Sequence, residues 1–232
     1  MANYLVVGAS SGIGHHLAHE LAEAGHQVYG TWFSHPTVSA GERLQYHPLN
    51  VLDETISLGF LPESLNGLVY CPGSIKLRPF EKLKAADFIS DYQLQTVGAI
   101  KIIQAVLPKL KQSGNASVVL FSTVAVKLGL NFHSLVASSK GAVEGLVRSL
   151  AAEFAPKIRF NAIAPSLTDT PLASSLLDTE QKREINAQKH PLKRIGNSGD
   201  MANMAAFLLS EKASWITGQI FHVDGGMSAL RT

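Results

Sequence analysis

The sequence has one cysteine, Cys71, among 232 residues, so no disulfide can form within the chain. A lone thiol fits a reducing compartment. No apolar run reaches the length of a membrane-spanning helix. A predicted strand begins by residue 4, which leaves no room for a signal peptide. We therefore expect a cytoplasmic protein without a membrane partner.

Charged residues are also scarce, at 16% of the chain, and the formal net charge is only +2. The basic residues are scattered, whereas nucleic-acid binding needs a clustered basic face, so we expect no nucleic-acid partner. The 46% hydrophobic content supplies a large core and favours burial of some surface in an oligomer. The length suits one α/β domain over residues 1–232, since no linker, repeat or low-complexity tract divides the chain. We expect no metal site.

The most informative stretch is a glycine-rich loop near the N-terminus. Tyr4–Val7 is a short apolar run that predicts a buried strand, and Gly8-Ala9-Ser10-Ser11-Gly12-Ile13-Gly14 follows at once. Apolar residues then recur at helical spacing, so a helix begins near Gly12. A helix N-terminus attracts phosphate, and glycine lets the backbone approach a pyrophosphate closely. The spacing is G-x-x-x-G-x-G, but its place between a strand and a helix favours nucleotide binding.

Strand and helix patterns alternate along the rest of the chain. Helices are predicted over 85–111, where Pro108 should kink or end the helix, over 133–154 and over 200–209. Asp53-Glu54 could start a short helix, and the polar segment 170–190 is predicted to be a mobile helical lid. Further strands are predicted over 28–33, 43–46, 66–70, 117–121, 158–163 and 219–223. Seven strands with intervening helices predict a doubly wound parallel sheet that binds ligands at the carboxyl ends of its strands.

Several motifs then occur in a recognisable order. They are the glycine loop, Cys-Pro-Gly at 71–73, Ser-Leu-Ala-Ala-Glu at 149–153, Asn-Ala-Ile-Ala-Pro at 161–165 and Ile-Thr-Gly-Gln-Ile-Phe-His-Val-Asp-Gly-Gly at 216–226. Together they make the chain resemble the short-chain dehydrogenase/reductase family from end to end, and it is similar to the 3-oxoacyl-acyl-carrier-protein reductases. The resemblance implies a Rossmann-like sheet and an NAD(P)(H)-dependent oxidoreductase. The hydride would move to or from a carbonyl, a hydroxyl or an activated alkene on a small or carrier-linked substrate.

The family's catalytic residues carry over only in part. Lys140 stands where the family has the lysine of Tyr-x-x-x-Lys, but Val136 occupies the tyrosine position. Thr123 falls at the serine position and keeps a hydroxyl, and Gln95 falls at the asparagine position. In the family the tyrosine gives the proton, the lysine lowers its pKa and holds the nicotinamide ribose, and the serine orients the carbonyl.

The missing tyrosine requires another proton donor, because losing a general acid costs about 10²–10⁴ in rate. His133 lies seven residues before Lys140, on the same helix face, and matches the Tyr-x6-Lys spacing of the related enoyl-acyl-carrier-protein reductases. We therefore predict that His133 is the acid, although it could merely precede or cap the helix. Ser122 and Ser138 are weaker candidates. An activated alkene or an iminium would need little acid help.

A pseudoenzyme is the alternative. Such a protein would keep the nucleotide loop and act as a regulatory or structural subunit. The changes at Val136 and Gln95 favour this interpretation, whereas the retention of Lys140 and Thr123 favours an enzyme.

The end of the second predicted strand bears on the choice of cofactor. NAD enzymes usually place an acidic residue there, and residues 29–36 contain none. This favours NADP(H), with NAD(H) as the alternative. The usual arginine is missing too, so His35, Ser34, His15 or Arg43 would have to hold the phosphate.

The resemblance implies further cofactor contacts. Asn50 and Val51 would flank the adenine, and Cys71 and Gly73 would border its ribose, with Cys71 a packed thiol rather than a nucleophile. The loop after the sixth strand lies on the nicotinamide side, and Ser166 there replaces the usual glycine. The complete expected set is Gly8, Ser10, Ser11, Gly12, Ile13, Gly14, Ser34, Asn50, Val51, Cys71, Gly73, Lys140, Pro165, Thr168 and Thr170.

Oligomers in this family usually form through the two long helices, here 85–111 and 133–154. Small residues on both helices permit close packing. We therefore expect a homotetramer or a homodimer. Residues 170–195 would cover the substrate, but they carry no chemistry that identifies it.

Overall fold

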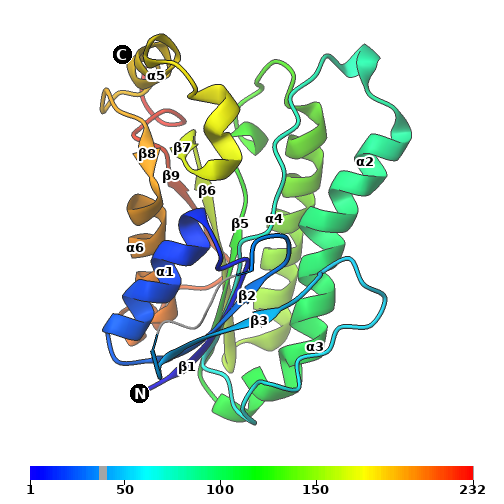
Figure 1. Cartoon of the computed structure of the whole chain (residues 1–232), viewed down its shortest axis with the longest axis vertical. Coiled ribbons are helices and arrows are strands. Elements are labelled where there is room, and N and C mark those ends of the chain that lie inside the picture. The colour runs from blue at the N-terminus through cyan, green and yellow to red at the C-terminus, as the bar shows by residue number, and fades with distance from the viewer. Residues whose placement is uncertain (37–40, 232) are drawn as a thin grey trace.

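The computed structural model describes residues 1–36 and 41–231, and a parallel sheet of seven strands forms its centre (Figure 1). The strand order is β3-β2-β1-β4-β5-β6-β9, and every neighbouring pair is parallel. The strands are β1 (Asn3–Val7), β2 (Gln27–Trp32), β3 (Leu44–Pro48), β4 (Gly67–Tyr70), β5 (Ala116–Phe121), β6 (Ile158–Pro165) and β9 (Ile220–Val223). The predicted doubly wound sheet is therefore confirmed. The order reverses between β1 and β4, where ligands of such sheets bind.

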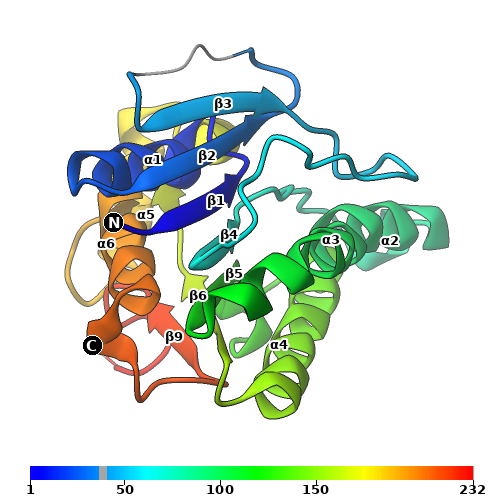
Figure 2. The ribbon, with the colours of Figure 1, turned by 90° about the horizontal axis from the view of Figure 1, so that it is seen from below.

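Helices cover both faces of the sheet (Figure 2). On one face lie α1 (Gly12–Glu23) and α6 (Ser198–Leu209), and on the other lie α3 (Gly98–Ser113) and α4 (Ser134–Phe154), with α2 (Ala85–Tyr92) beside them. Within the described residues, no helix combines the length and the apolarity needed to cross a membrane.

Strand β1 shows why its sequence is apolar at every position. Leu5 and Val7 belong to the core that packs against α3 and α4, whereas Tyr4 and Val6 belong to the core that packs against α1 and α6. Successive side chains of a strand point to opposite faces, so a central strand of a covered sheet is buried on both sides. This burial places the end of β1, and the glycine loop after it, in the middle of the carboxyl edge of the sheet.

The segment predicted as a lid is partly helical. It contains a 3-10 helix, η4 (Pro171–Leu176), and α5 (Glu180–Gln188), above the carboxyl edge of the sheet (Figure 1). The two-residue strands β7 (Thr168–Asp169) and β8 (Gly196–Asn197) pair at its base. Strands this short carry no sequence period, so the pattern did not predict them.

The helix predicted over 85–111 is divided, and of the two effects predicted for Pro108, a kink or an end, the helix does not end there. Helix α2 passes into a π-helical turn, η2 (Gln93–Val97), before α3 begins. Pro108 lies inside α3, which continues to Ser113 and ends at Gly114, where φ is 74°. A proline removes one hydrogen bond, but the fully buried Val106 and Leu110 hold the helix against the sheet on either side of it.

The short helix predicted from Asp53-Glu54 does not form. Asn50 instead directs a turn there, since its Oδ1 accepts from Leu52 N at 3.1 Å and its Nδ2 donates to Asp53 Oδ1 at 2.6 Å. Asparagine side chains that bond the nearby backbone compete with helix formation in this way.

Candidate active site

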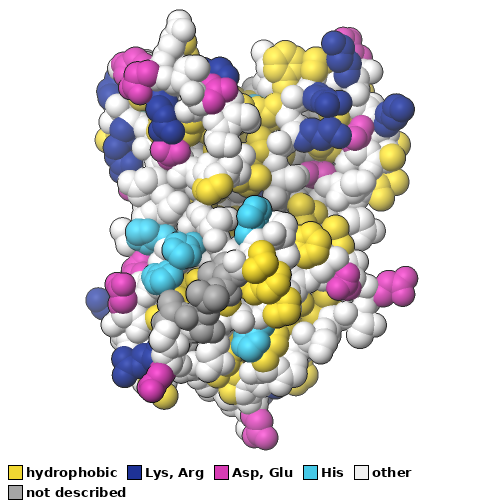
Figure 3. All heavy atoms as spheres, viewed as in Figure 1, with side chains coloured by type: hydrophobic (Ala, Val, Ile, Leu, Met, Phe, Trp, Pro, Cys, Tyr) yellow, Lys and Arg dark blue, Asp and Glu magenta, His cyan; other side chains and the backbone are white. Residues whose placement is uncertain are grey.

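Two neighbouring cavities lie at the carboxyl edge of the sheet. One, of about 550 Å³, lies beside the glycine loop and the end of β2, and the other, of about 740 Å³, lies beneath the lid segment. Both are lined by Ile13, Cys71, Gly73 and Thr170. Figure 3 shows this edge of the molecule hollowed between its two upper parts, with hydrophobic side chains inside the hollow.

The glycine loop forms one end of the smaller cavity. Gly8 and Gly12 have φ values of 78° and 55°, a left-handed conformation that favours glycine. The amide of Gly8 donates to Thr31 Oγ1 at 3.2 Å, and the amide of Ala9 donates to Thr31 O at 2.8 Å, so β2 fixes the loop. The start of α1 thereby faces the cavity with backbone N–H groups that can donate hydrogen bonds to an anion.

The geometry of this loop fits a dinucleotide. A Cβ on Gly14 would collide with the carbonyl group of Gly8. Because Gly14 has no side chain, the start of α1 can pack closely against the loop. The structure brings twelve of the expected cofactor residues to the walls of this cavity, namely Gly8, Ser10, Ser11, Gly12, Ile13, Gly14, Ser34, Asn50, Val51, Cys71, Gly73 and Thr170. The remaining three, Lys140, Pro165 and Thr168, line the larger cavity.

The end of β2 forms the far wall of the smaller cavity. Of the four residues proposed to hold a phosphate, Ser34 and His35 line it, and Ser34 Oγ lies 2.9 Å from His35 Nδ1. The other two do not. The guanidinium of Arg43 lies beside Gly25, at the turn after α1, and His15 packs its ring against His19 at 4.3 Å. Among the described residues that line this cavity, none carries a carboxylate.

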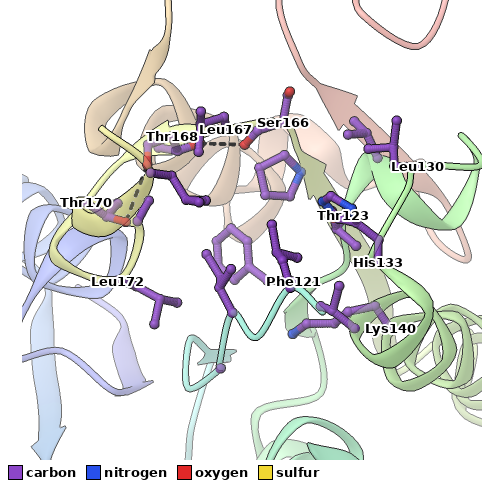
Figure 4. A pocket seen from close by; sticks show the side chains of 18 of the residues that line it. Phe121, Thr123, Leu130, His133, Lys140, Ser166, Leu167, Thr168, Thr170 and Leu172 are labelled. Carbon is purple, nitrogen blue, oxygen red and sulfur yellow. Dashed lines mark hydrogen bonds between the residues drawn. The ribbon is translucent and has the colours of Figure 1, made fainter. Parts of the chain in front are cut away.

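The predicted catalytic residues meet in the larger cavity. Gln95, Thr123, His133 and Lys140 all line it, and Val136 forms part of the same wall. In Figure 4, His133 and Lys140 lie on one side of the cavity, and Thr170 and Leu172 lie on the opposite side.

His133 immediately precedes α4 and is anchored through one ring nitrogen. Its Nδ1 lies 2.7 Å from the backbone oxygen of Asn131. Because a carbonyl oxygen only accepts, this contact assigns the hydrogen to Nδ1. The other ring nitrogen, Nε2, is then the one that can exchange a proton within the cavity. His133 makes no side-chain hydrogen bond to cap α4, but it does occupy the position directly before the helix, as the alternative expected.

Lys140 is buried, with 7% of its surface exposed. Burial lowers the pKa of its ammonium group from 10.5 to about 8, while the charges of Asp91 and Cys71 act in the opposite direction. Burial also raises the pKa of the Cys71 thiol to about 12. Cys71 is therefore a neutral thiol near pH 7, as expected of a packed residue rather than a nucleophile.

Sequence reasoning missed a polar network beside Lys140. The carboxylate of Asp91, on α2, is 6% exposed and accepts from Ser74 Oγ at 2.5 Å. Gln95 Nε2 donates to both oxygens of the same carboxylate, at 2.9 and 2.8 Å. The i,i+4 spacing of Asp91 and Gln95 could have indicated that their side chains are neighbours on a helix. The sequence alone does not show that this helix face is buried.

Sequence reasoning also missed the partner of Ser166. Its Oγ lies 2.8 Å from His190 Nε2, while His190 Nδ1 lies 2.8 Å from the backbone oxygen of Asn186. His190 is 3% exposed. The pair therefore ties the end of α5 to the loop after β6, where the resemblance implies a glycine.

The rest of the larger cavity is mainly apolar. Its hydrophobic lining comes from the loop after β4, the end of β5, the segment before α4 and the lid segment, and includes Ile75, Leu77, Phe121, Val124, Leu130, Leu167, Leu172 and Leu176. Within residues 1–36 and 41–231, no group of three or more histidine, cysteine, aspartate or glutamate side chains could hold a metal ion.

Comparisons with known proteins agree with this geometry. Residues 8–228 match a family model described as enoyl-(acyl carrier protein) reductase. A tropinone reductase homologue of Arabidopsis thaliana is 33% identical over 97% of this chain and 92% of its own length. A solved short-chain type dehydrogenase/reductase from Mycobacterium ulcerans superposes with a TM-score of 0.89 at 28% identity, covering 99% of this chain and 90% of its own. The structure of ElxO with NADP bound gives a TM-score of 0.88 at 26% identity, covering 99% of this chain and 100% of its own.

Proposed function

Because the chain belongs to the short-chain dehydrogenase/reductase family of nicotinamide-dependent oxidoreductases, we propose that it is an NADP(H)-preferring enzyme with His133 as its proton donor. The reaction is hydride transfer to or from a carbonyl, a hydroxyl or an activated alkene. The observation that carries the proposal is that His133, Thr123 and Lys140 line one cavity, which shares lining residues with the cavity of the glycine loop.

Each of the three residues has a separate role. Bound NADPH would supply the hydride. Thr123 Oγ–H donates to the substrate oxygen, and Lys140 holds the nicotinamide ribose and stabilises the developing negative charge. The imidazolium of His133 then gives its Nε2 proton to that oxygen, which becomes a hydroxyl, and the imidazole takes another proton from solvent. Val136, in the position of the family tyrosine, has no proton to give.

The proposed preference for NADP(H) rests on the wall of the smaller cavity. An acidic side chain would repel the 2′-phosphate, and none lines that wall among the described residues. Ser34 and His35 supply polar groups there. The NADP bound to ElxO, a protein of similar fold, supports the same preference.

The proposed substrate is a small or carrier-linked molecule with an apolar body, because the exposed surface of the larger cavity is mainly apolar although about half of its lining residues are polar. We also propose a homodimer or homotetramer in the reducing cytoplasm. Phe80, Ile89 and Tyr92 expose large apolar surfaces at and near α2, and a second copy would cover them. Light scattering of the purified protein measures the assembly directly.

The first experiment is a fluorescence titration of the purified protein with NADPH and with NADH. We expect NADPH to bind at least tenfold more tightly. Tighter binding of NADH would overturn the cofactor proposal but not the enzyme. Binding of neither would contradict the proposed reaction and would favour a pseudoenzyme whose glycine loop no longer binds a nucleotide; the replacement of the tyrosine by Val136 supports a pseudoenzyme.

Turnover is then measured with a panel of ketones and enones under saturating NADPH. Oxidation of NADPH that depends on one of these substrates supports the enzyme. Tight NADPH binding without turnover across the panel would instead support a nucleotide-binding subunit.

A further inference from the structure

Asp91 is a buried carboxylate that the reaction described above does not use. A buried carboxylate is costly unless hydrogen bonds satisfy it. Asp91 receives three, from Ser74 Oγ and from Gln95 Nε2 to each of its oxygens, and no basic side chain bonds it directly among the described residues. Packing alone does not explain why a carboxylate is kept at the buried position 91.

The bonds to Asp91 determine how the Gln95 amide lies. An ionised carboxylate only accepts, so the NH₂ group of Gln95 must face Asp91 and its oxygen must face away. That oxygen, Oε1, is buried and makes no hydrogen bond to any described residue. A buried amide oxygen without a donor is unusual and costs free energy.

Oε1 of Gln95 and the amine of Lys140 lie beside the same glycine, Gly73. A Cβ built on Gly73 would lie 3.4 Å from Gln95 Oε1 and 3.9 Å from Lys140 Nζ. Gly73 has no side chain, so both polar atoms face the small space beside it. The Thr96 hydroxyl donates to Ser139 O at 3.0 Å and ties the π-helical turn that carries Gln95 to α4, the helix that carries Lys140.

We propose that Asp91 is a positioning residue, which acts through Gln95 to aim the amide oxygen at Lys140 and supplies the negative charge that keeps Lys140 an ammonium ion. This inference rests on the proposed role of Lys140. Without a tyrosine at position 136, the charge of Lys140 is needed to bind the cofactor ribose and to stabilise the substrate oxygen. Ser74 closes the network on the cavity side, since it lines the cavity and donates to the carboxylate.

The other groups near Lys140 do not supply this charge. The thiol of Cys71 faces Lys140 from the loop after β4, but its raised pKa of about 12 keeps it neutral. His133 lines the same cavity from the start of α4 and would carry a positive charge when protonated. Asp91 is therefore the anion whose charge favours the ammonium form of Lys140.

The test measures the reactivity of Lys140 directly and needs no substrate. Trace acetic anhydride acetylates only the free amine, so the labelling rate of the Lys140 peptide, followed by mass spectrometry from pH 6 to 10, reports its protonation. In Asp91→Asn we expect Lys140 to label about fivefold faster at pH 7 than in the wild type. Loss of a nearby opposite charge shifts an ionisation equilibrium by about tenfold, and from a pKa of about 8 this raises the fraction of free amine at pH 7 about fivefold. Asp91→Glu should restore the slow labelling.

Asp87→Asn is the matched control. Asp87 is on the same helix but pairs with Lys76, so its loss should leave Lys140 labelling unchanged. Asp91→Ser is a second variant that removes the same charge and leaves room for water. The test can be made with whichever of Asp91→Asn and Asp91→Ser folds. Equal labelling curves for the wild type and a folded Asp91 variant would overturn the proposal, even if NADPH binds. Failure of NADPH to bind the wild type would overturn the proposed function without touching the labelling result.

Discussion

The backbone of Gly14 packs directly against the carbonyl group of Gly8, so that no side chain fits between the start of α1 and the end of β1. This contact closes the glycine loop and directs the first turn of α1 at the smaller cavity. Because the same contact serves both stability and cofactor binding, a substitution here should affect both.

We expect Gly14→Ala to lower the free energy of unfolding by about 1–3 kcal/mol, the usual cost of overpacking, and to weaken NADPH binding at least tenfold. Thermal or urea unfolding and the fluorescence titration measure the two effects. Gly145→Ala is the control, because a Cβ there meets nothing within 4 Å. It should be neutral or slightly stabilising, since alanine favours the helix. Unchanged NADPH affinity in Gly14→Ala would contradict the assigned pyrophosphate site.

His133→Ala should lower kcat by about 10²–10⁴ while leaving NADPH affinity within about twofold, because the acid acts on the substrate oxygen and not on the cofactor. His19→Ala, on α1 and outside both cavity linings, is the control for loss of a histidine.

Val136→Tyr in the His133→Ala background should recover turnover at least tenfold, since it returns an acidic hydroxyl to the position four residues before Lys140. Steady-state kinetics compare the double variant with the His133→Ala single variant. Wild-type turnover in the single variant would rule out His133 as the donor. Absence of recovery in the double variant would show that position 136 cannot reach the reacting oxygen.

Ser34→Asp should reverse the cofactor preference. A carboxylate at this wall would repel the 2′-phosphate of NADPH and accept hydrogen bonds from the ribose hydroxyls of NADH. We expect NADPH to bind at least tenfold more weakly and NADH more tightly, as measured by parallel titrations. Ser34→Asn keeps the size without the charge and should change the NADPH/NADH ratio much less. An unaltered ratio in Ser34→Asp would place the phosphate elsewhere.

Asp200 gives a pH-dependent contribution to stability. Its carboxylate receives two hydrogen bonds from Arg194, at 2.6 and 2.7 Å, and one from the amide of Asn197 at 2.8 Å, and these bonds lower its pKa below 3.8. A lowered pKa in the folded state means that the stabilisation is present above about pH 4 and is lost as the pH falls through the folded value.

We expect Asp200→Asn to be less stable than the wild type by about 1 kcal/mol at pH 7, mainly through the lost helix cap, and the difference to shrink below pH 4. Urea unfolding at pH 7 and pH 3.5 measures it. Asp178→Asn breaks only an exposed pair with Lys182 and should cost less than about 0.5 kcal/mol at either pH. A difference for Asp200→Asn that is constant with pH would contradict the assigned pairing.

The sequence by itself determined the sheet, the loop and the main helices. The central runs, such as Tyr4–Val7 and 117–121, are largely apolar and buried on both faces. Helical periods fill the segments between the strands, so local pattern specified a doubly wound parallel sheet. The glycine spacing located the end of β1. The helix predicted over 133–154 corresponds to α4, which carries Lys140, although His133 lies immediately before its first residue. These features are encoded over a few neighbouring residues, which is why they could be predicted.

Only the tertiary structure decided which distant residues meet. Asn50 directs a turn where charge suggested a helix, α3 passes through Pro108 because its flanking residues are buried, and Arg43 lies beside the turn after α1 rather than beside the cofactor cavity. Asp91, Ser74 and Lys140 come from α2, the loop after β4 and α4, and no sequence spacing relates them. Their meeting depends on how the helices pack on the sheet, because burial, which gives a carboxylate and an amine their chemistry, is a property of the assembled fold.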